Sequence, residues 1–177
     1  MQTPAGANTW PAFWLLSSPS LTNTSLKTAE LDVIESYGNW GTSTNYSPPG
    51  DPNNYQIAWH DWMPGGTNTG GQFNVLHPGA ATAMTTGYHT YGVDVEPSGI
   101  KWYFDRNLVW QSPIYASAQA PLYLLVNLAL GGGSHNNSTG TGYNWSLTPD
   151  PTDLKVQYMA VWASPNSPNY IVSPRKP

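Results

Sequence analysis

Short apolar segments, each bounded by turn residues, recur along the whole chain, and long amphipathic helical patterns are hard to find. Strands are predicted at residues 10–16, 29–36, 55–62, 72–76, 88–96, 100–104, 108–111, 122–130 and 153–163. Residues 112–120 are irregular and can hold a helical turn. Seventeen glycines and seventeen prolines supply the breaks between these segments. Many short strands separated by turn signals predict an all-β sandwich.

Two of the predicted strands differ from the others in composition. Residues 122–130 are apolar on both faces apart from Asn127, which predicts a central strand. The segment Glu30-Leu31-Asp32-Val33-Ile34-Glu35 instead places three carboxylates on an otherwise apolar run. Because Asp, Glu, Lys and Arg together make up only 9% of the chain, this cluster indicates a function rather than random surface.

The spacing of the three acids has a geometric consequence. Side chains alternate between the faces of a strand, so Glu30 and Asp32 share one face while Glu35 would point to the other. A β-bulge near Val33 and Ile34 adds one residue and returns Glu35 to the face of Glu30. The same bulge has to help close the gap between Glu30 and Glu35 to the ~5–5.5 Å of a retaining glycosidase. We therefore predict a bulge here if the acids act together.

Three interpretations of this acidic cluster are open. It can be a solvated strand face, or its oxygens can bind a calcium ion. It can also be the carboxylate pair of glycoside hydrolysis, in which one acid attacks and the other protonates the leaving oxygen. What surrounds the motif, rather than the motif alone, favours catalysis.

The remaining composition narrows the partner. The net charge is −4 with only six Lys and Arg residues, which argues against nucleic acid, an anionic membrane or a strongly anionic polysaccharide. Nine Trp and eleven Tyr residues supply rings that fill a core and stack on sugar rings. Cysteine is absent, which excludes disulfides, zinc thiolate sites and thiol catalysis. An aromatic-rich, charge-poor chain predicts a neutral carbohydrate ligand.

The length of 177 residues predicts a single domain with a sizeable core. We assign residues 1–163 to this domain and the proline-rich residues 164–177 to a tail or linker. The sequence has neither a run of eighteen apolar residues nor a charged segment followed by an apolar one. Neither a transmembrane helix nor a signal peptide is therefore expected.

Four segments, taken together and in order, resemble family 16 of the glycoside hydrolases, the laminarinase and β-glucanase group. They are Trp10-Pro11-Ala12-Phe13-Trp14, Glu30 to Glu35, His89-Thr90-Tyr91 with the hairpin after it, and the strand at 122–130 with the glycines Gly131 and Gly132. The resemblance covers roughly residues 2–162. It implies a concanavalin-like β-jelly roll of two antiparallel sheets with an open concave cleft. It also implies an extracellular endo-hydrolase that cleaves a neutral β-1,3- or β-1,3/1,4-glucan with retention.

The resemblance also assigns roles to residues. Glu30 resembles the nucleophile, Glu35 the acid/base, and Asp32 the assisting carboxylate between them. Five further residues are expected to bind the glycan: Trp10, Trp14, His60, His89 and Asn127. Each of these has a structural alternative, because a Trp can fill the core, a His can serve as a hydrogen-bond partner, and a buried amide needs partners of its own.

The chain departs from the family pattern at two places. It begins almost at the Trp-Pro-Ala segment, so we expect an N-terminally incomplete domain with a sheet edge or part of the core left unprotected. Gln157 stands where many members have the Asp that helps to bind a structural calcium, so no metal or cofactor is expected. A monomer is expected if the fold is complete.

Two other functions remain as alternatives to the glucan hydrolase. One is a non-catalytic, lectin-like jelly roll that binds carbohydrate, and the other is an endoglycanase acting on a bacterial exopolysaccharide. Presence of all three acids, Glu30, Asp32 and Glu35, favours catalysis over binding alone.

Overall fold

The computed structural model describes residues 1–4, 9–18, 22–23, 25–36, 54–75, 84–130 and 151–162. Within these ranges the chain forms strands and one short 3₁₀ helix. They are β1 (Thr9–Ser17), β2 (Thr28–Glu35), β3 (Tyr55–Trp62), β4 (Asn68–Val75), β5 (Tyr91–Glu96), β6 (Gly99–Phe104), β7 (Asn107–Ser112), η2 (Ala116–Gln119) and β8 (Leu122–Leu130). None of the helical structure in these ranges is long and apolar enough to span a membrane.

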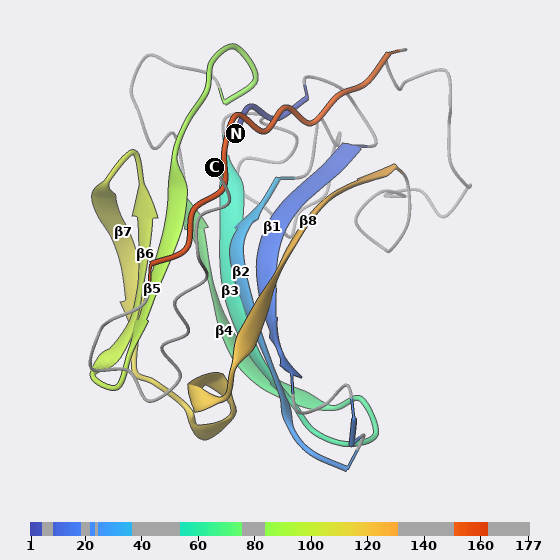
Figure 1. Cartoon of the computed structure of the whole chain (residues 1–177), viewed down its shortest axis with the longest axis vertical. Coiled ribbons are helices and arrows are strands. Elements are labelled where there is room, and N and C mark those ends of the chain that lie inside the picture. The colour runs from blue at the N-terminus through green and yellow to red at the C-terminus, as the bar shows by residue number, and fades with distance from the viewer. Residues whose placement is uncertain are drawn as a thin grey trace, which may run out of the picture.

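The strands form two antiparallel sheets that face each other as two layers (Figure 1). One sheet is curved and has the strand order β4-β3-β2-β1-β8, and the other has the order β5-β6-β7. The helix η2 lies at one end of the layers, on the connection from β7 to β8 (Figure 1). β2 therefore lies in the middle of the larger sheet, with paired strands on both sides.

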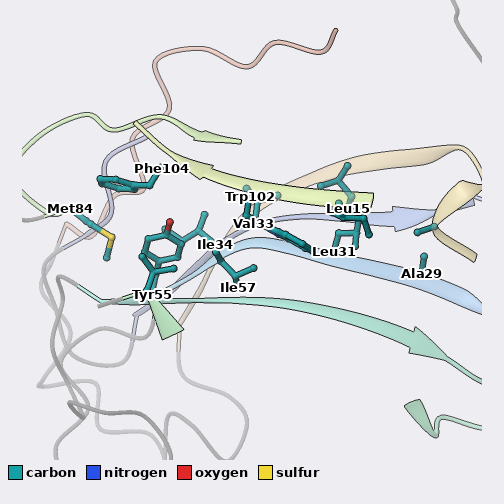
Figure 2. Packing of buried hydrophobic residues seen from close by; sticks show 13 residues of the cluster. Leu15, Ala29, Leu31, Val33, Ile34, Tyr55, Ile57, Met84, Trp102 and Phe104 are labelled. Carbon is teal, nitrogen blue, oxygen red and sulfur yellow. The ribbon is translucent and has the colours of Figure 1, made fainter. Parts of the chain in front are cut away.

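The core fills the space between the two sheets (Figure 2). Leu31 of β2 and Ile57 of β3 point into it from the larger sheet, and Trp102 and Phe104 of β6 point into it from the smaller one. Alternation along each strand sends these side chains inward and their neighbours outward. Burial of this apolar area, at about 25 cal/mol per Å², holds the layers together.

Most of the predicted strands are confirmed. β1, β2, β3, β8 and the β6–β7 hairpin lie at their predicted places, and the predicted helical turn is η2. The short strand predicted at 72–76 is β4, which begins at Asn68, and the strand predicted at 88–96 begins only at Tyr91. The hairpin turn places Asp105 and Arg106 at positive φ, 47° and 67°. The predicted tail at 164–177 and the glycines Gly131 and Gly132 lie outside the described residues.

Two strand predictions are wrong. β8 is not a central strand, because within the described ranges it pairs with β1 alone, and Leu124 and Leu130 are exposed. Residues 153–162 form no strand, because Lys155 makes a single bridge to Gln2 and the residues after it have no neighbouring strand among those described. An apolar segment becomes a strand only when a partner completes its hydrogen-bond ladder.

Candidate active site

β2 carries a β-bulge in the middle of its acidic segment. Toward β1, Asp32 lies opposite Trp14 while Ile34 lies opposite Phe13, so Val33 is an extra residue without a counterpart. Toward β3, the register shifts between Asp32 and the end of the strand as well. The bulge is therefore present on both sides of β2, where the sequence predicted it.

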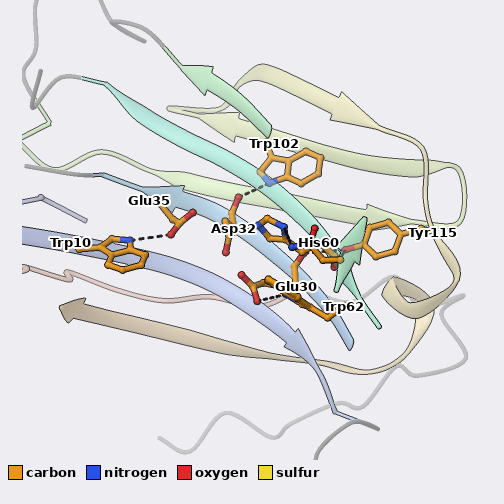
Figure 3. A network of polar contacts seen from close by, with 9 residues as sticks. Trp10, Glu30, Asp32, Glu35, His60, Trp62, Trp102 and Tyr115 are labelled. Atoms are coloured by element: carbon orange, nitrogen blue, oxygen red, sulfur yellow. Dashed lines mark hydrogen bonds and ion pairs between the residues drawn. The ribbon is translucent and has the colours of Figure 1, made fainter. Parts of the chain in front are cut away.

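The bulge changes the direction of the last acid. Val33 and Ile34 are consecutive residues, yet both belong to the buried core. Glu35 consequently returns to the outer face of the sheet, where Glu30 and Asp32 also lie (Figure 3). The predicted placement of the three acids on one face is confirmed, and the core side of the same strand stays apolar.

Glu30 lies opposite His60 of β3 and next to Trp62. Trp62 donates its Nε1–H to Oε2 of Glu30 at 2.8 Å, and its ring centroid is 5.3 Å from that of His60. Burial and the neighbouring Asp32 raise the pKa of Glu30, while the Trp62 hydrogen bond and His60 act in the opposite direction. The N–H group thus opposes protonation of Glu30.

Asp32 is the most deeply buried of the three acids, with a side chain that is 4% exposed. Its Oδ2 lies 3.4 Å from Nε2 of His60. Burial raises the pKa of Asp32, and the contact with His60 opposes this rise. From the core side, Trp102 donates its Nε1–H to the main-chain oxygen of Asp32 at 3.0 Å (Figure 3). The smaller sheet thus contacts the backbone directly beside the bulge.

His60 connects the acids to β4. Its Nδ1 lies 3.3 Å from the side-chain amide of Asn68, and its Nε2 lies 3.4 Å from Oδ2 of Asp32. Burial lowers the pKa of His60, but Asp32, Glu30 and Glu35 raise it by more, and its pKa is raised overall. The three acids therefore favour the protonated form of the His60 imidazole.

Glu35 has its own indole partner. Trp10 of β1 donates its Nε1–H to Oε1 of Glu35 at 3.0 Å, as Figure 3 shows. Glu35 lies opposite Ala12, so Trp10 reaches it diagonally across the β1–β2 pair. Each of the two glutamates thus accepts a hydrogen bond from a tryptophan on a flanking strand.

Trp14 and Asn127 lie together on the β1–β8 side of the acids. Trp14 is opposite Asp32, and its Nε1–H donates to Oδ1 of Asn127 at 2.7 Å in an exposed position. The hydrogen-bond partner that the sequence required for Asn127 is therefore an indole. Four of the predicted glycan-binding residues lie on these strands around the acids: Trp10, Trp14, His60 and Asn127.

His89 is the exception. It is 7% exposed, its Nδ1 lies 2.7 Å from Oδ2 of Asp105, and its ring stacks on Phe104 at 4.9 Å. Phe104 belongs to the core between the sheets. Asp105 and the core thus supply the partners of His89, which is the structural alternative for a histidine, and its contact with the glycan stays a prediction.

Three residues of the site were not singled out from the sequence: Trp62, Trp102 and Tyr115. Trp62 follows His60 by two residues on a strand, so alternation alone could have placed it on the same face. Trp102 and Tyr115 lie far from the acids in sequence. The Tyr115 hydroxyl is 3.1 Å from the carbonyl oxygen of Glu30 and 3.3 Å from that of His60. Only the packing of the layers brings these two residues to the site.

Glu30, Asp32 and His60 also offer the donor atoms of a possible cation site, since one ligand atom of each lies within 4.8 Å of the others. Trp62 already directs an N–H at Glu30, and the imidazole of His60 faces Asp32. These groups compensate the carboxylates without a metal. The donor set therefore fits an acid–base cluster better than a metal centre.

The two layers form a β-jelly-roll sandwich with a row of carboxylates on the outer face of its larger sheet. The chain belongs to the glycosyl hydrolases family 16, whose family model matches residues 1–147. The resemblance indicated by the four sequence segments is thereby confirmed.

Individual relatives agree with this assignment. The chain is 33% identical to the endo-1,3-1,4-β-glycanase EglC of Rhizobium meliloti over 129 residues, which cover 73% of the chain and 23% of that protein. It is 28% identical to the glucan endo-1,3-β-glucosidase A1 of Niallia circulans over 171 residues, 90% of the chain and 23% of that protein. The chain thus spans about a quarter of the length of these curated relatives.

Solved structures show the same fold. The laminarinase catalytic domain of Thermotoga maritima matches with a TM-score of 0.61 at 18% identity, over 86% of this chain and 55% of that one. The GH16 of the Bacteroides ovatus mixed linkage glucan PUL matches with a TM-score of 0.62 at 20% identity, over 81% of this chain and 60% of that one. At these identities the likeness concerns the fold.

Proposed function

We propose that this chain carries the catalytic machinery of a retaining endo-glycoside hydrolase that cleaves internal β-glucosidic linkages. Glu30 is the nucleophile, Glu35 is the acid/base, and Asp32 assists between them. The observation that carries the proposal is the bulge at Val33 and Ile34. Without that extra residue, Glu35 would point into the core and could not act with Glu30.

The proposed reaction has two steps. In the first, Glu35 protonates the glycosidic oxygen while a carboxylate oxygen of Glu30 bonds to the anomeric carbon, and the bond from that carbon to the leaving oxygen breaks. In the second, Glu35 takes a proton from water, the water oxygen attacks the anomeric carbon, and Glu30 leaves as a carboxylate. Two inversions at one carbon give a product with the original anomeric configuration.

The surroundings of the acids support a neutral sugar as substrate. Trp10 and Trp14 offer aromatic rings beside them, and such rings stack on the apolar faces of pyranoses. Asn127 offers an amide to sugar hydroxyls, and His60 offers an imidazole. Lys27, the lysine that precedes β2, pairs with Asp61.

The names of the relatives suggest the linkage. They include a 1,3-1,4-β-glycanase and a 1,3-β-glucosidase. We therefore propose a β-1,3- or β-1,3/1,4-glucan as substrate, with a bacterial exopolysaccharide as the alternative. Because such polymers lie outside cells, we also propose that the protein is secreted. The catalytic domain is proposed to end at residue 163.

The test is hydrolysis of a panel of β-1,3-, β-1,3/1,4- and exopolysaccharide glucans, with the product anomer recorded by NMR. We expect early release of oligosaccharides with retained β-configuration. Glu30→Gln is expected to abolish hydrolysis without changing the fold, because it removes the nucleophile at constant volume. Glu35→Ala should be partly rescued by azide on a substrate with a good leaving group. Wild-type rates in either variant, or an inverted product, would contradict the assignment, and binding without turnover would favour the lectin-like alternative.

A further inference from the structure

Trp62 stands at the end of β3, with its polar edge directed at an acid. Its Nε1–H lies 2.8 Å from Oε2 of Glu30. Its ring lies against that of His60, with 5.3 Å between centroids and 30° between planes (Figure 3). Since Glu30 is opposite His60, Trp62 reaches the carboxylate diagonally across the β2–β3 pair. Trp62 thus binds one of the two carboxylate oxygens of Glu30, Oε2.

The charges around Glu30 make this donor important. Asp32 faces it from the same strand, His60 faces it from β3, and the hydroxyl of Tyr115, the residue before η2, approaches its main chain. In the part of the chain that the structure describes, Trp62 is the side chain that donates a hydrogen bond to the Glu30 carboxylate. A half-buried carboxylate beside a second carboxylate is costly to ionise, and an N–H aimed at one of its oxygens lowers that cost.

We propose that Trp62 is a positioning residue for Glu30: it holds Oε2, keeps the carboxylate ionised, and leaves Oε1 to attack the anomeric carbon. This inference rests on the proposed function, in which Glu30 is the nucleophile. It differs from the usual role of an aromatic residue near a glycan. A stacking platform presents its ring face to the sugar, whereas here the N–H edge points to the acid and one face packs against His60.

Trp62→Phe tests the N–H while keeping an aromatic ring against His60. Loss of a hydrogen bond to a charged group should lower kcat by about 10- to 100-fold. KM should change little, because the ring remains. The acidic limb of the kcat/KM profile should move to higher pH, since a nucleophile that must be ionised has lost a group favouring its charged form.

A second readout does not depend on turnover. The chain has only three glutamates, Glu30, Glu35 and Glu96, so ¹³C-labelled glutamate gives three carboxyl signals, and Glu30→Gln identifies that of Glu30. In Trp62→Phe, the titration of the Glu30 signal should shift to higher pH, and the Glu96 signal serves as an internal chemical-shift reference. If the Phe variant folds poorly, benzothienylalanine at position 62 takes its place, because it has the shape of Trp without the N–H. It should give the same shift of the Glu30 titration.

Trp110→Phe is the matched control. Trp110 lies on β7 in the smaller sheet, where its ring packs against Trp102 and stacks on Phe73. Its replacement should leave kcat, the pH profile and the Glu30 titration at wild-type values.

The outcomes distinguish the positioning role of Trp62 from the proposed function as a glycoside hydrolase. An unchanged Glu30 titration in both Trp62 variants would overturn the positioning role. A raised KM with an unmoved acidic limb would also overturn it, because Trp62 would then act by stacking on the sugar. The wild-type protein could hydrolyse no glucan while the Glu30 titration shifts in the Trp62 variants as expected. That result would contradict the proposed function and leave the hydrogen-bond effect of Trp62 on Glu30 established.

Discussion

Replacing Trp102 with phenylalanine tests whether the smaller sheet holds the bulge of β2 in place. Trp102 is fully buried, and its Nε1–H donates to the main-chain oxygen of Asp32 at 3.0 Å. The carbonyl lies at the point where the register of β2 shifts against both neighbours. The substitution removes this donor and one ring, but keeps an apolar aromatic side chain in the core.

The expected loss of stability has two parts. A buried carbonyl that loses its donor costs about 1–3 kcal/mol. Loss of the second ring adds about 1 kcal/mol, a fraction of the ~3–5 kcal/mol for truncation of a buried Trp to Ala. The free energy of unfolding should therefore fall by about 2–4 kcal/mol. Because Asp32 is one of the three acids proposed to act in hydrolysis, with Glu30 and Glu35, the rate of glucan hydrolysis should fall as well.

Urea unfolding, monitored by far-UV circular dichroism, measures the loss of stability. The rate of glucan hydrolysis well below the melting temperature measures the loss of activity. Phe104→Leu is the control, because it shrinks a ring in the same core cluster without touching the Trp102 hydrogen bond. It should lower stability and preserve kcat. A Trp102→Phe variant within about 0.5 kcal/mol of wild type, or one as active as Phe104→Leu, would refute a supporting role for the smaller sheet.

Two further predictions concern charge and space. Burial alone would raise the pKa of Asp105, but hydrogen bonds from His89 and Thr90 lower it overall. Its contribution to stability is present above the unfolded value of about 3.9 and is lost as pH falls through the lower folded value. The stability difference between wild type and Asp105→Asn in urea unfolding should therefore shrink as pH falls from 5 to 2, and a difference independent of pH would contradict this. In Gly70→Ala, the new Cβ would collide with the Trp59 carbonyl oxygen and lie 3.1 Å from Nδ1 of His60. We expect about 1–3 kcal/mol of destabilisation and reduced hydrolysis, whereas Gly92→Ala, with no atom within 4 Å, should change neither.

The placement of Glu30, Asp32 and Glu35 on one face could be predicted from the sequence, because it depends only on residues of the same strand. Three carboxylates at positions 30, 32 and 35 can share a face only if one residue is inserted, and Val33 and Ile34 are apolar enough to be that insertion. The structure confirms the bulge through two consecutive core residues. The hydrophobic pattern was likewise sufficient for the strands that have paired neighbours.

Other features depend on which elements become neighbours, and the sequence does not contain that information locally. The apolar residues 122–130 predicted a central strand, but among the described residues β8 pairs with β1 alone. Residues 153–162 have strand composition, but the described chain offers them only the bridge at Lys155. His89 could serve a site or a core until the position of Asp105 fixed its partner.

Side chains on both faces of β2 form hydrogen bonds that hold Glu30, Asp32 and Glu35 in position. On the outer face, Trp10 and Trp62 donate to the carboxylates of Glu35 and Glu30. On the inner face, Trp102 binds a backbone oxygen at the bulge, and the Tyr115 hydroxyl approaches that of Glu30. A bulge breaks the hydrogen-bond ladder of its own strand, so other elements have to hold it in one conformation. The geometry of the acids is therefore a property of the packed sandwich rather than of β2 alone. It follows that core changes contacting this backbone should lower stability and activity together, while changes at the β7 edge should lower stability alone.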